Sequence, residues 1–218
     1  MAYLDDFCNN TLQFMQQNVV YVILPHDTTG IVEVVVEPRV PAATISNIAV
    51  GVVGGVVAGG VYKMRRRAAT DTNGLNVYFC PYSNNSTKPL MLGNGALWMF
   101  TATMDGCTFG VGSQGPGSNG NVRVCHANNA SQARPDIVFG GDTGRAAQGR
   151  MQAMFARSHV GPDGMLIEPA SYMGDDFGQK ATTFGTHAHG AAWGFRALTY
   201  RQAGNVFTHG GIVDYPVP

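Results

Sequence analysis

The sequence predicts an α+β fold in which a mixed β-sandwich core is flanked by helices. Two observations support this class: many short β-prone runs are separated by turn residues, and only a few segments suit helices. A chain of 218 residues can bury a large core without a metal or a disulfide framework. We expect a single catalytic domain over residues 1–218, with residues 1–70 as a candidate peripheral N-terminal subregion.

The expected elements follow from the local spacing of apolar residues. Residues 4–17 suit a short helix, and residues 145–159 carry the clearest amphipathic pattern, with Met151, Met154 and Phe155 at helical spacing. The HDTTG stretch, with His26 and Asp27, is interpreted as a surface turn, and residues 81–89 (PYSNNSTKP) are interpreted as a loop. The strand candidates are residues 19–24, 31–36, 76–80, 95–103, 109–111, 122–124, 137–139, 165–167, 181–187, 192–202 and 206–213.

Residues 43–67 form the most unusual segment. Residues 48–62 carry no charge, and Lys63 and three arginines follow at once. We interpret the apolar part as two Val-rich core strands that turn near Gly54 and Gly55. Two alternatives stay open: a buried helix with a glycine face, and membrane insertion. Insertion is disfavoured because a helix of about 15 residues rises only ~23 Å, less than the hydrocarbon core.

Composition excludes several classes of function. The 14 basic and 14 acidic residues cancel, so no global field indicates nucleic acid or an anionic membrane as a partner. Four cysteines without a CxxC pair indicate neither a zinc site nor a disulfide scaffold, and we expect no metal and no cofactor. The acidic N-terminus lacks the features of a Sec signal. We therefore expect synthesis in a reducing cytoplasm, or export without a cleaved signal.

Two β-prone runs around the Gly-rich loop 112–121 predict a β-hairpin. If the pairing closes at Val111 and Val122, Cys107 stands opposite His126, with Cβ atoms roughly 4.5–5.5 Å apart. A neighbouring imidazole can take the proton of a thiol, so this pair predicts a nucleophilic cysteine. A buried cysteine and a hydrogen-bonded histidine in an ordinary hairpin is the alternative interpretation.

The residues beside this pair refine the hypothesis. Gly106 permits a positive-φ turn, which would expose the Cys107 thiol at a strand edge. A slip of one residue in the register would bring Cys125 onto the face of His126. In the register that we favour, Cys125 lies on the opposite face as an inert core thiol, and Asn128 is a further candidate to orient the histidine.

Other candidates are interpreted as structural. His187, His189 and His209 could gather around zinc, but no carboxylate or cysteine stands at a suitable spacing, so we favour polar strand residues. Asp142 in GGDTG is interpreted as a turn former ahead of a cation ligand or a third catalytic group. Cys8 and Cys80 receive no role, and Trp98 and Trp193 are assigned to the core.

Residues 95–130 resemble the catalytic segment of the cytotoxic necrotizing factor deamidases. The shared features are Cys107-Thr108, a short strand, a polar loop and a second strand ending in His126. That family includes the Burkholderia lethal factor type of single-domain toxin, and bacterial chemoreceptor glutamine deamidases share its core. The resemblance implies a Cys–His site on a β-sandwich that acts on a glutamine side chain of a protein, with Cys107 as the nucleophile and His126 as the general base.

The same resemblance offers two ways to orient the histidine. The lethal-factor type has a threonine six residues before its cysteine, and Thr101 stands there. The necrotizing-factor type instead uses a backbone carbonyl from an earlier strand. A longer Cys–His loop, and Met104-Asp105 where relatives often have Leu-Ser, depart from the family pattern and leave the choice of substrate open.

We therefore predict a thiol-dependent protein glutamine deamidase, a secreted bacterial toxin or effector that acts in the cytoplasm of a target cell, with a host GTPase or translation factor as a candidate substrate. The backbone N–H groups of Gly106 and Cys107 are the expected oxyanion donors. The alternatives are a Cys–His peptidase, a transglutaminase-like acyltransferase, or a non-enzymatic protein that binds a membrane or partner through residues 43–67.

Overall fold

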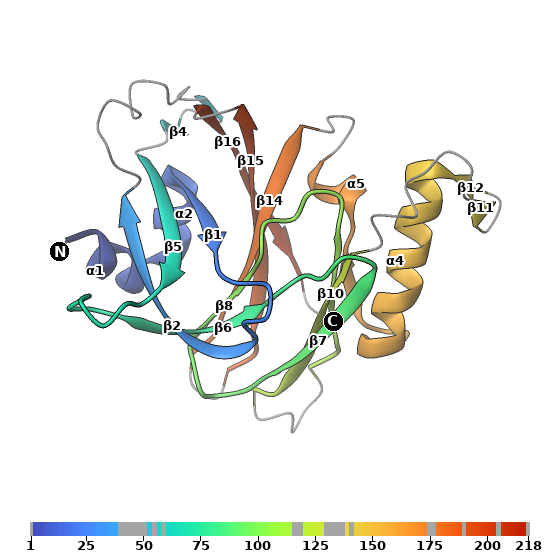
Figure 1. Ribbon diagram of the computed structural model, residues 1–218, viewed down its shortest axis with the longest axis horizontal. Coiled ribbons are helices and arrows are strands. Elements are labelled where there is room, and N and C mark those ends of the chain that lie inside the picture. The colour runs from blue at the N-terminus through green and yellow to red at the C-terminus, as the bar shows by residue number, and fades with distance from the viewer. Residues whose placement is uncertain are drawn as a thin grey trace.

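Strands form about half of the described chain, and most of them lie in two sheets with helices at either end (Figure 1). Two further strand pairs, β3–β4 and β11–β12, form small sheets of their own. The computed structural model describes residues 2–38, 52–53, 56–57, 60–114, 120–128, 138–139, 142–173, 178–188, 191–203 and 206–216. The expected β-rich α+β class is confirmed.

The first sheet has eight strands and curls until it nearly closes. Its edge strand β1 contacts β14, β15 and the opposite edge strand β16. The pairs β1–β5 and β6–β8 are parallel, and the other neighbouring strands are antiparallel. In spatial order the strands are β1 (Asn18–Ile23), β5 (Gly60–Arg66), β2 (Gly30–Pro38), β6 (Leu75–Cys80), β8 (Trp98–Thr101), β14 (Gln179–Thr186), β15 (Gly194–Ala203) and β16 (Val206–Tyr215).

The inner side of this curled sheet is filled by aromatic and β-branched side chains. Helices α1 (Ala2–Asn9) and α2 (Thr11–Gln17) cover it and contribute Phe7 and Met15, both with 0% exposure. The sequence predicts one helix over residues 4–17, but the helix is interrupted at Asn10. The Asn10 side chain accepts a hydrogen bond from the Gln13 N–H at 3.1 Å, so it caps the second helix.

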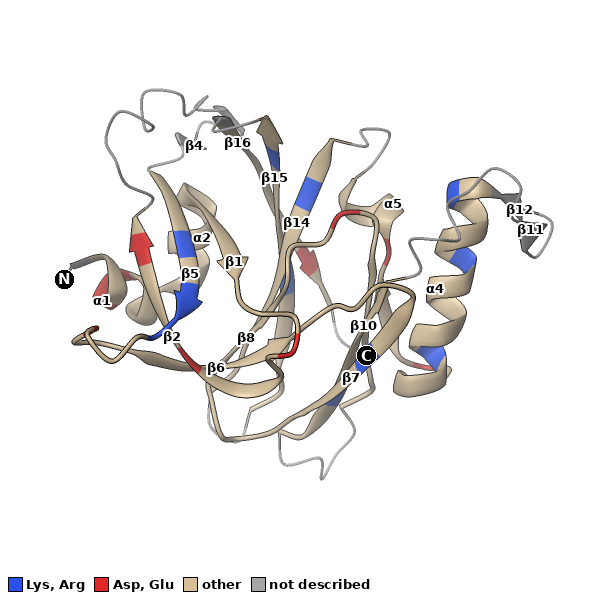
Figure 2. Cartoon of the chain, in the orientation of Figure 1, with Lys and Arg blue, Asp and Glu red and all other residues tan. Residues whose placement is uncertain are grey.

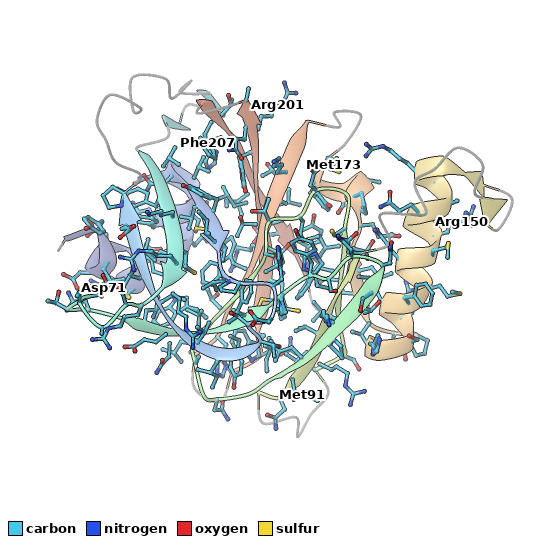
Figure 3. The ribbon with its side chains drawn as sticks, in the orientation of Figure 1. Asp71, Met91, Arg150, Met173, Arg201 and Phe207 are labelled. Atoms are coloured by element: carbon cyan, nitrogen blue, oxygen red, sulfur yellow. The ribbon has the colours of Figure 1, made fainter. Side chains whose placement is uncertain are left out.

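The second sheet has four antiparallel strands in the order β13 (Met165–Ile167), β9 (Thr108–Val111), β10 (Val122–Asn128) and β7 (Ser86–Leu92). Alternation along β9 and β10 gives this sheet two different faces. Phe109, Val111 and Val124 pack with residues of the large sheet, whereas Cys125 and Ala127 pack under a helix. Side chains fill the space between the two sheets (Figure 3).

Helix α4 (Gly144–Val160) covers the outer face of the second sheet, as Figure 1 shows. It confirms the helix expected over residues 145–159, but the apolar spacing indicated the wrong buried face. Met154 and Phe155 are 47% and 36% exposed, whereas Gln148 and Gln152 are buried against the sheet. Its close approach to β9 depends on Gly110, because a Cβ there would lie 3.3 Å from the Ala156 Cβ and 2.9 Å from the Cys125 Sγ. Lys and Arg colours, without Asp or Glu colours, occur along this helix (Figure 2).

The unusual segment is strand structure where it is described. β3 (Val52–Val53) pairs antiparallel with β4 (Val56–Val57), as expected of two Val-rich strands. The turn expected near Gly54 and Gly55 lies outside the described residues. Residues 43–51 lie outside the described residues. Within the described ranges, none of the helices has the length and apolar character needed to cross a bilayer.

The basic residues that follow this segment are paired within the fold. Lys63 and Arg65 contact Glu37 at 2.7 and 2.8 Å, and Arg65 also contacts Asp71 at 2.8 Å. The Arg65 guanidinium lowers the pKa of Asp71 to about 2. Carboxylates of the same domain therefore compensate most of this basic run, which weakens the case for a membrane-binding flank.

Strand β7 lies where a loop was expected. Residues 81–89 are predicted as loop, but β7 begins at Ser86 and pairs with β10 along its length. It is an edge strand, which tolerates Pro89 because only one side of the strand needs a complete ladder. Met91 on this strand is 50% exposed and lies at the lower margin of the molecule (Figure 3). The remaining short elements are α5 (Pro169–Tyr172), β11 (Val138–Phe139) and β12 (Asp142–Thr143).

Candidate active site

Cys107 lies at the entrance to β9, immediately after a tight turn. The chain leaves β8, forms an isolated bridge between Met104 and Ala181, and turns at Gly106 with φ +83°. The predicted positive-φ glycine is therefore present. The predicted exposure of the thiol is wrong, because Cys107 is only 5% exposed and packs among the apolar side chains between the sheets.

His126 lies in the middle of β10, and its side chain is completely buried. Its partner across the hairpin is Phe109, whereas the sequence predicts Cys107. The hairpin itself is confirmed, but its register differs from the expected one by two residues. A shift of two keeps every side chain on its face, so His126 still points to the layer that contains Cys107.

Cys107 and His126 are thus diagonal neighbours rather than directly opposed residues. Such diagonal positions are typically about 7–8 Å apart between backbones, and long side chains can span that distance. Within the part of the chain that the structure describes, neither ring nitrogen of His126 has a hydrogen-bond partner, the Cys107 thiol included. The Cys107 thiol and the His126 imidazole therefore lie in the same layer between the sheets but are not hydrogen-bonded to each other.

Burial holds both groups in their neutral forms. It raises the pKa of the Cys107 thiol to about 12 and lowers the pKa of the His126 imidazole to about 4. The proton therefore stays on the sulfur in this resting arrangement. Catalytic hydrogen bonds are often long in unliganded enzymes and tighten only with substrate, so this geometry is compatible with a Cys–His pair that closes on binding.

Thr101 does not orient His126. Its hydroxyl accepts a hydrogen bond from the Thr183 N–H at 3.2 Å and donates to the Thr183 carbonyl at 3.4 Å. Thr101 is fully buried and joins β8 to β14. The threonine that the resemblance assigns to the histidine is used here to hold two strands together, which corrects that prediction.

A backbone carbonyl is the better candidate to orient the histidine. Cys80, the last residue of β6, pairs with Thr101, and its carbonyl favours the protonated imidazole of His126. The carbonyl partly opposes the effect of burial on the histidine pKa, although it makes no hydrogen bond of good geometry with the ring. This group comes from an earlier strand, and nothing in the local sequence around Cys80 marked it.

One of the two backbone N–H groups expected to stabilise the oxyanion already has a hydrogen-bond acceptor. The Gly106 N–H donates to the Tyr172 hydroxyl at 3.1 Å, so it would reach a substrate only if that hydroxyl moved. The same hydroxyl donates to the Cys107 carbonyl at 2.9 Å. A role for the Cys107 N–H stays a prediction.

A second buried side chain holds the same turn from α4. Gln152 donates through Nε2 to the Gly106 carbonyl at 3.0 Å, and its Oε1 accepts from the Thr108 hydroxyl at 3.1 Å. Sequence reasoning missed Gln152 and Tyr172. The apolar spacing of the helix concealed Gln152, because Met154 and Phe155 indicated another face as the buried one.

Cys125 has the structural position expected for it. It points to the face opposite His126, where its thiol donates to the Ala156 carbonyl at 3.6 Å under α4. Burial raises the pKa of this thiol to about 12. Cys125 is therefore a chemically similar buried thiol outside the candidate site, and it serves as a matched control for Cys107.

His187 and His209 have hydrogen-bond partners of their own. His209 bonds the Met15 carbonyl at 2.9 Å, and His187 bonds the Ala191 carbonyl at 3.1 Å while stacking on Trp193. His189 and the Asp142 side chain lie outside the described residues. Asn128 ends β10 and is buried.

An aromatic ring lies on another side of His126. The Tyr82 ring lies 6.0 Å from the imidazole between centroids and 4.6 Å from the ring of the exposed His26. The turn that carries His26 therefore lies nearer the candidate site than the sequence indicated.

No protein-family model matches the chain, and no curated protein matches its sequence.

Proposed function

We propose that the protein is a thiol-dependent protein glutamine deamidase in which Cys107 is the nucleophile and His126 the general base. One observation carries the proposal: a fully buried imidazole, with no hydrogen-bond partner among the described residues, lies in the same layer as a buried thiol. Leaving a polar group buried and unpaired costs about 1–3 kcal/mol, so such a group calls for an explanation. A catalytic base whose contact with the thiol forms only when substrate binds is one such explanation.

The turn at Gly106 adds further support. A nucleophile at the start of a strand, next to a backbone held by buried side chains, has little conformational freedom to lose on the way to the transition state. The resemblance of residues 95–130 to the necrotizing-factor segment points to the same chemistry, with a protein glutamine as the substrate.

The proposed reaction has two halves. His126 takes the thiol proton, the Cys107 sulfur attacks the carboxamide carbon, and the C–N bond breaks as the imidazolium returns the proton to the departing ammonia. The product is a thioester. A water molecule then loses a proton to His126 and attacks the thioester carbon, which releases glutamate and regenerates the thiol. The reaction consumes one water and releases one ammonia for each glutamine converted.

The resting pKa values set a condition on this reaction. Because burial keeps Cys107 protonated and His126 neutral, proton transfer requires the two side chains to close their diagonal gap. Binding of a protein substrate can supply that rearrangement, since its binding energy is available to reshape the site. Action in a target-cell cytoplasm, as a secreted effector, belongs to the same proposal.

The test compares four proteins in cleared extracts of animal and bacterial cells: wild type, Cys107→Ala, His126→Ala and Cys125→Ala. Ammonia release and mass spectrometry of glutamine-to-glutamate conversion should be positive for wild type and Cys125→Ala only. New peptide termini would indicate a peptidase, and incorporation of a fluorescent primary amine would indicate an acyltransferase. Conversion by Cys107→Ala at the wild-type rate would end the proposal.

A further inference from the structure

The turn that presents Cys107 is held by two side chains from distant parts of the chain. Tyr172 on α5 bonds the Gly106 N–H and the Cys107 carbonyl, and Gln152 on α4 bonds the Gly106 carbonyl. Both polar groups of the Gly106 backbone are therefore bound by side chains. A glycine at φ +83° is conformationally permissive, so these contacts determine where the next residue lies.

Burying the polar amide of Gln152 at this position costs free energy, and its hydrogen bonds to the turn explain why a glutamine is present. It is 0% exposed on the face of α4 that packs on the second sheet, between positions occupied by Gln148 and Ala156. An apolar side chain would be buried there without any need for hydrogen bonds. The amide is accommodated because Thr108 and Gly106 satisfy its two ends.

The buried Tyr172 side chain also makes specific hydrogen bonds to this turn. It is 2% exposed, and its hydroxyl uses one acceptor and one donor function on neighbouring backbone groups of the Gly106–Cys107 turn. Phenylalanine would fill the same space but leave a buried N–H and a buried carbonyl unpaired. The hydroxyl therefore adds local rigidity beyond what ring packing supplies.

We propose that Tyr172 and Gln152 are positioning residues that clamp the Gly106–Cys107 turn and keep the Cys107 thiol both protected and correctly placed. The role in placement rests on the proposed function, but the protection of the thiol does not. The clamp couples α4 and α5 to the nucleophile. Loosening the turn should therefore have two opposite effects. It should increase the access of reagents to Cys107, and it should lower the rate of glutamine conversion because it disturbs the geometry needed for turnover.

The first test measures labelling of each cysteine by iodoacetamide, resolved by peptide mass spectrometry, in Tyr172→Phe and Gln152→Met. We expect Cys107 labelling to rise roughly 10-fold or more, while Cys80 and Cys125 stay at wild-type rates, because the opening is local. Equal increases at all three buried thiols would show global destabilisation and overturn the clamp. No change at Cys107 would overturn it as well.

Matched controls are available on α4 and on strand β16, which contacts α5 through Ser171. Tyr215→Phe removes a hydroxyl that bonds Ser171 at 2.9 Å, next to Tyr172, but leaves the turn untouched. Gln148→Met changes a buried glutamine on the same helix face, 8% exposed, one turn earlier. Neither control should alter Cys107 labelling. If a control variant raised Cys107 labelling as much as the clamp variants do, the loss of any side-chain contact near α4 or α5 would be enough to expose the thiol. That result would refute the specific role of Tyr172 and Gln152.

The second readout is glutamine conversion in the same cell extracts. The clamp predicts that Tyr172→Phe lowers the rate roughly 10-fold while Cys107 becomes more reactive toward iodoacetamide. Unchanged conversion beside raised labelling would overturn the placement role. If wild type itself converts no glutamine, the proposed function fails, and the labelling comparison still decides whether the clamp protects the thiol.

Discussion

His126 lies directly opposite Phe109 across the pairing of β10 with β9. An aromatic side chain, and not the thiol, therefore occupies the position nearest the imidazole in this ladder. Cys107 enters the same layer from one diagonal step away. This relationship explains how a Cys–His pair can lie on one sheet face and still rest in an unengaged, neutral state.

The reactivity of Cys107 in the free protein should be low at neutral pH. Burial raises its pKa to about 12 from an ordinary 9.0, so the thiolate is scarce and shielded. Iodoacetamide should label the exposed Cys8 first, and Cys107 labelling should increase with pH without a plateau near neutrality. Rapid labelling of Cys107 below pH 7, lost in His126→Ala, would contradict this resting state and indicate a preformed ion pair.

Acid should destabilise the fold through His126. Its folded pKa is about 4, below the ordinary 6.5, so the unfolded chain binds the extra proton between these values. This contribution to stability is fully present above pH 6.5 and is lost as the pH falls toward 4. The difference is on the order of 3 kcal/mol. Urea unfolding of wild type and His126→Asn at several pH values should show a flatter profile for the variant.

The comparison isolates one histidine because the other titrating groups are the same in both proteins. Identical pH profiles for wild type and His126→Asn would mean that the imidazole is solvated in solution, against its burial in the structure.

Gly110→Ala should loosen the contact between β9 and α4. The new Cβ would lie 2.9 Å from the Cys125 Sγ and 3.3 Å from side-chain atoms of Ala156 and Val160, which forces the helix or the thiol to move. We expect a loss of about 1–3 kcal/mol in unfolding free energy. Thermal or urea unfolding measures it.

A double-mutant cycle identifies the atom responsible. Cys125→Ala removes the shortest of these contacts, so part of the Gly110→Ala penalty should be recovered in the double variant. Gly149→Ala is the control, since a Cβ there meets nothing within 4 Å and alanine favours the helix, giving a gain of up to about 1 kcal/mol. Additive effects of Gly110→Ala and Cys125→Ala would exclude the sulfur contact.

Gly106→Ala should separate backbone strain from function. Gly106 (φ +83°) and Gly161 (φ +90°) both have left-handed backbones, and a Cβ added at either glycine would meet nothing within 4 Å. The cost of alanine at each position is therefore conformational, about 1–2 kcal/mol. Only the first change disturbs the turn before Cys107. We expect similar stability losses from unfolding measurements, but altered Cys107 labelling in Gly106→Ala alone.

Local features of this protein could be predicted because they depend on neighbouring residues. The hairpin around residues 112–121 and the turn at Gly106 follow from short β-prone runs and glycine. The helix at residues 145–159 was located correctly, but its apolar spacing indicated the wrong face, because Met154 and Phe155 are exposed. The strand β7 was missed because Pro89 and a run of polar residues obscured it, and only its edge position makes that composition acceptable.

The register of the hairpin could not be predicted from the sequence. Pairings that differ by two residues put the same side chains on the same faces, so alternation alone cannot choose between Phe109 and Cys107 as the partner of His126. The choice depends on how the loop and the layer between the sheets pack. Thr101 was misassigned for a similar reason, since its partner Thr183 is 82 residues away in the chain.

The sequence by itself determined the β-rich class, the location of most strands and the placement of Cys107 and His126 at one hairpin, because these depend on local periodicity and turn chemistry. Only the tertiary structure decided that both groups are buried and neutral, that the Cys80 carbonyl lies beside the imidazole, and that Tyr172 and Gln152 hold the turn. Those contacts join residues 46 to 66 positions apart, and their formation depends on how the two sheets and α4 pack together.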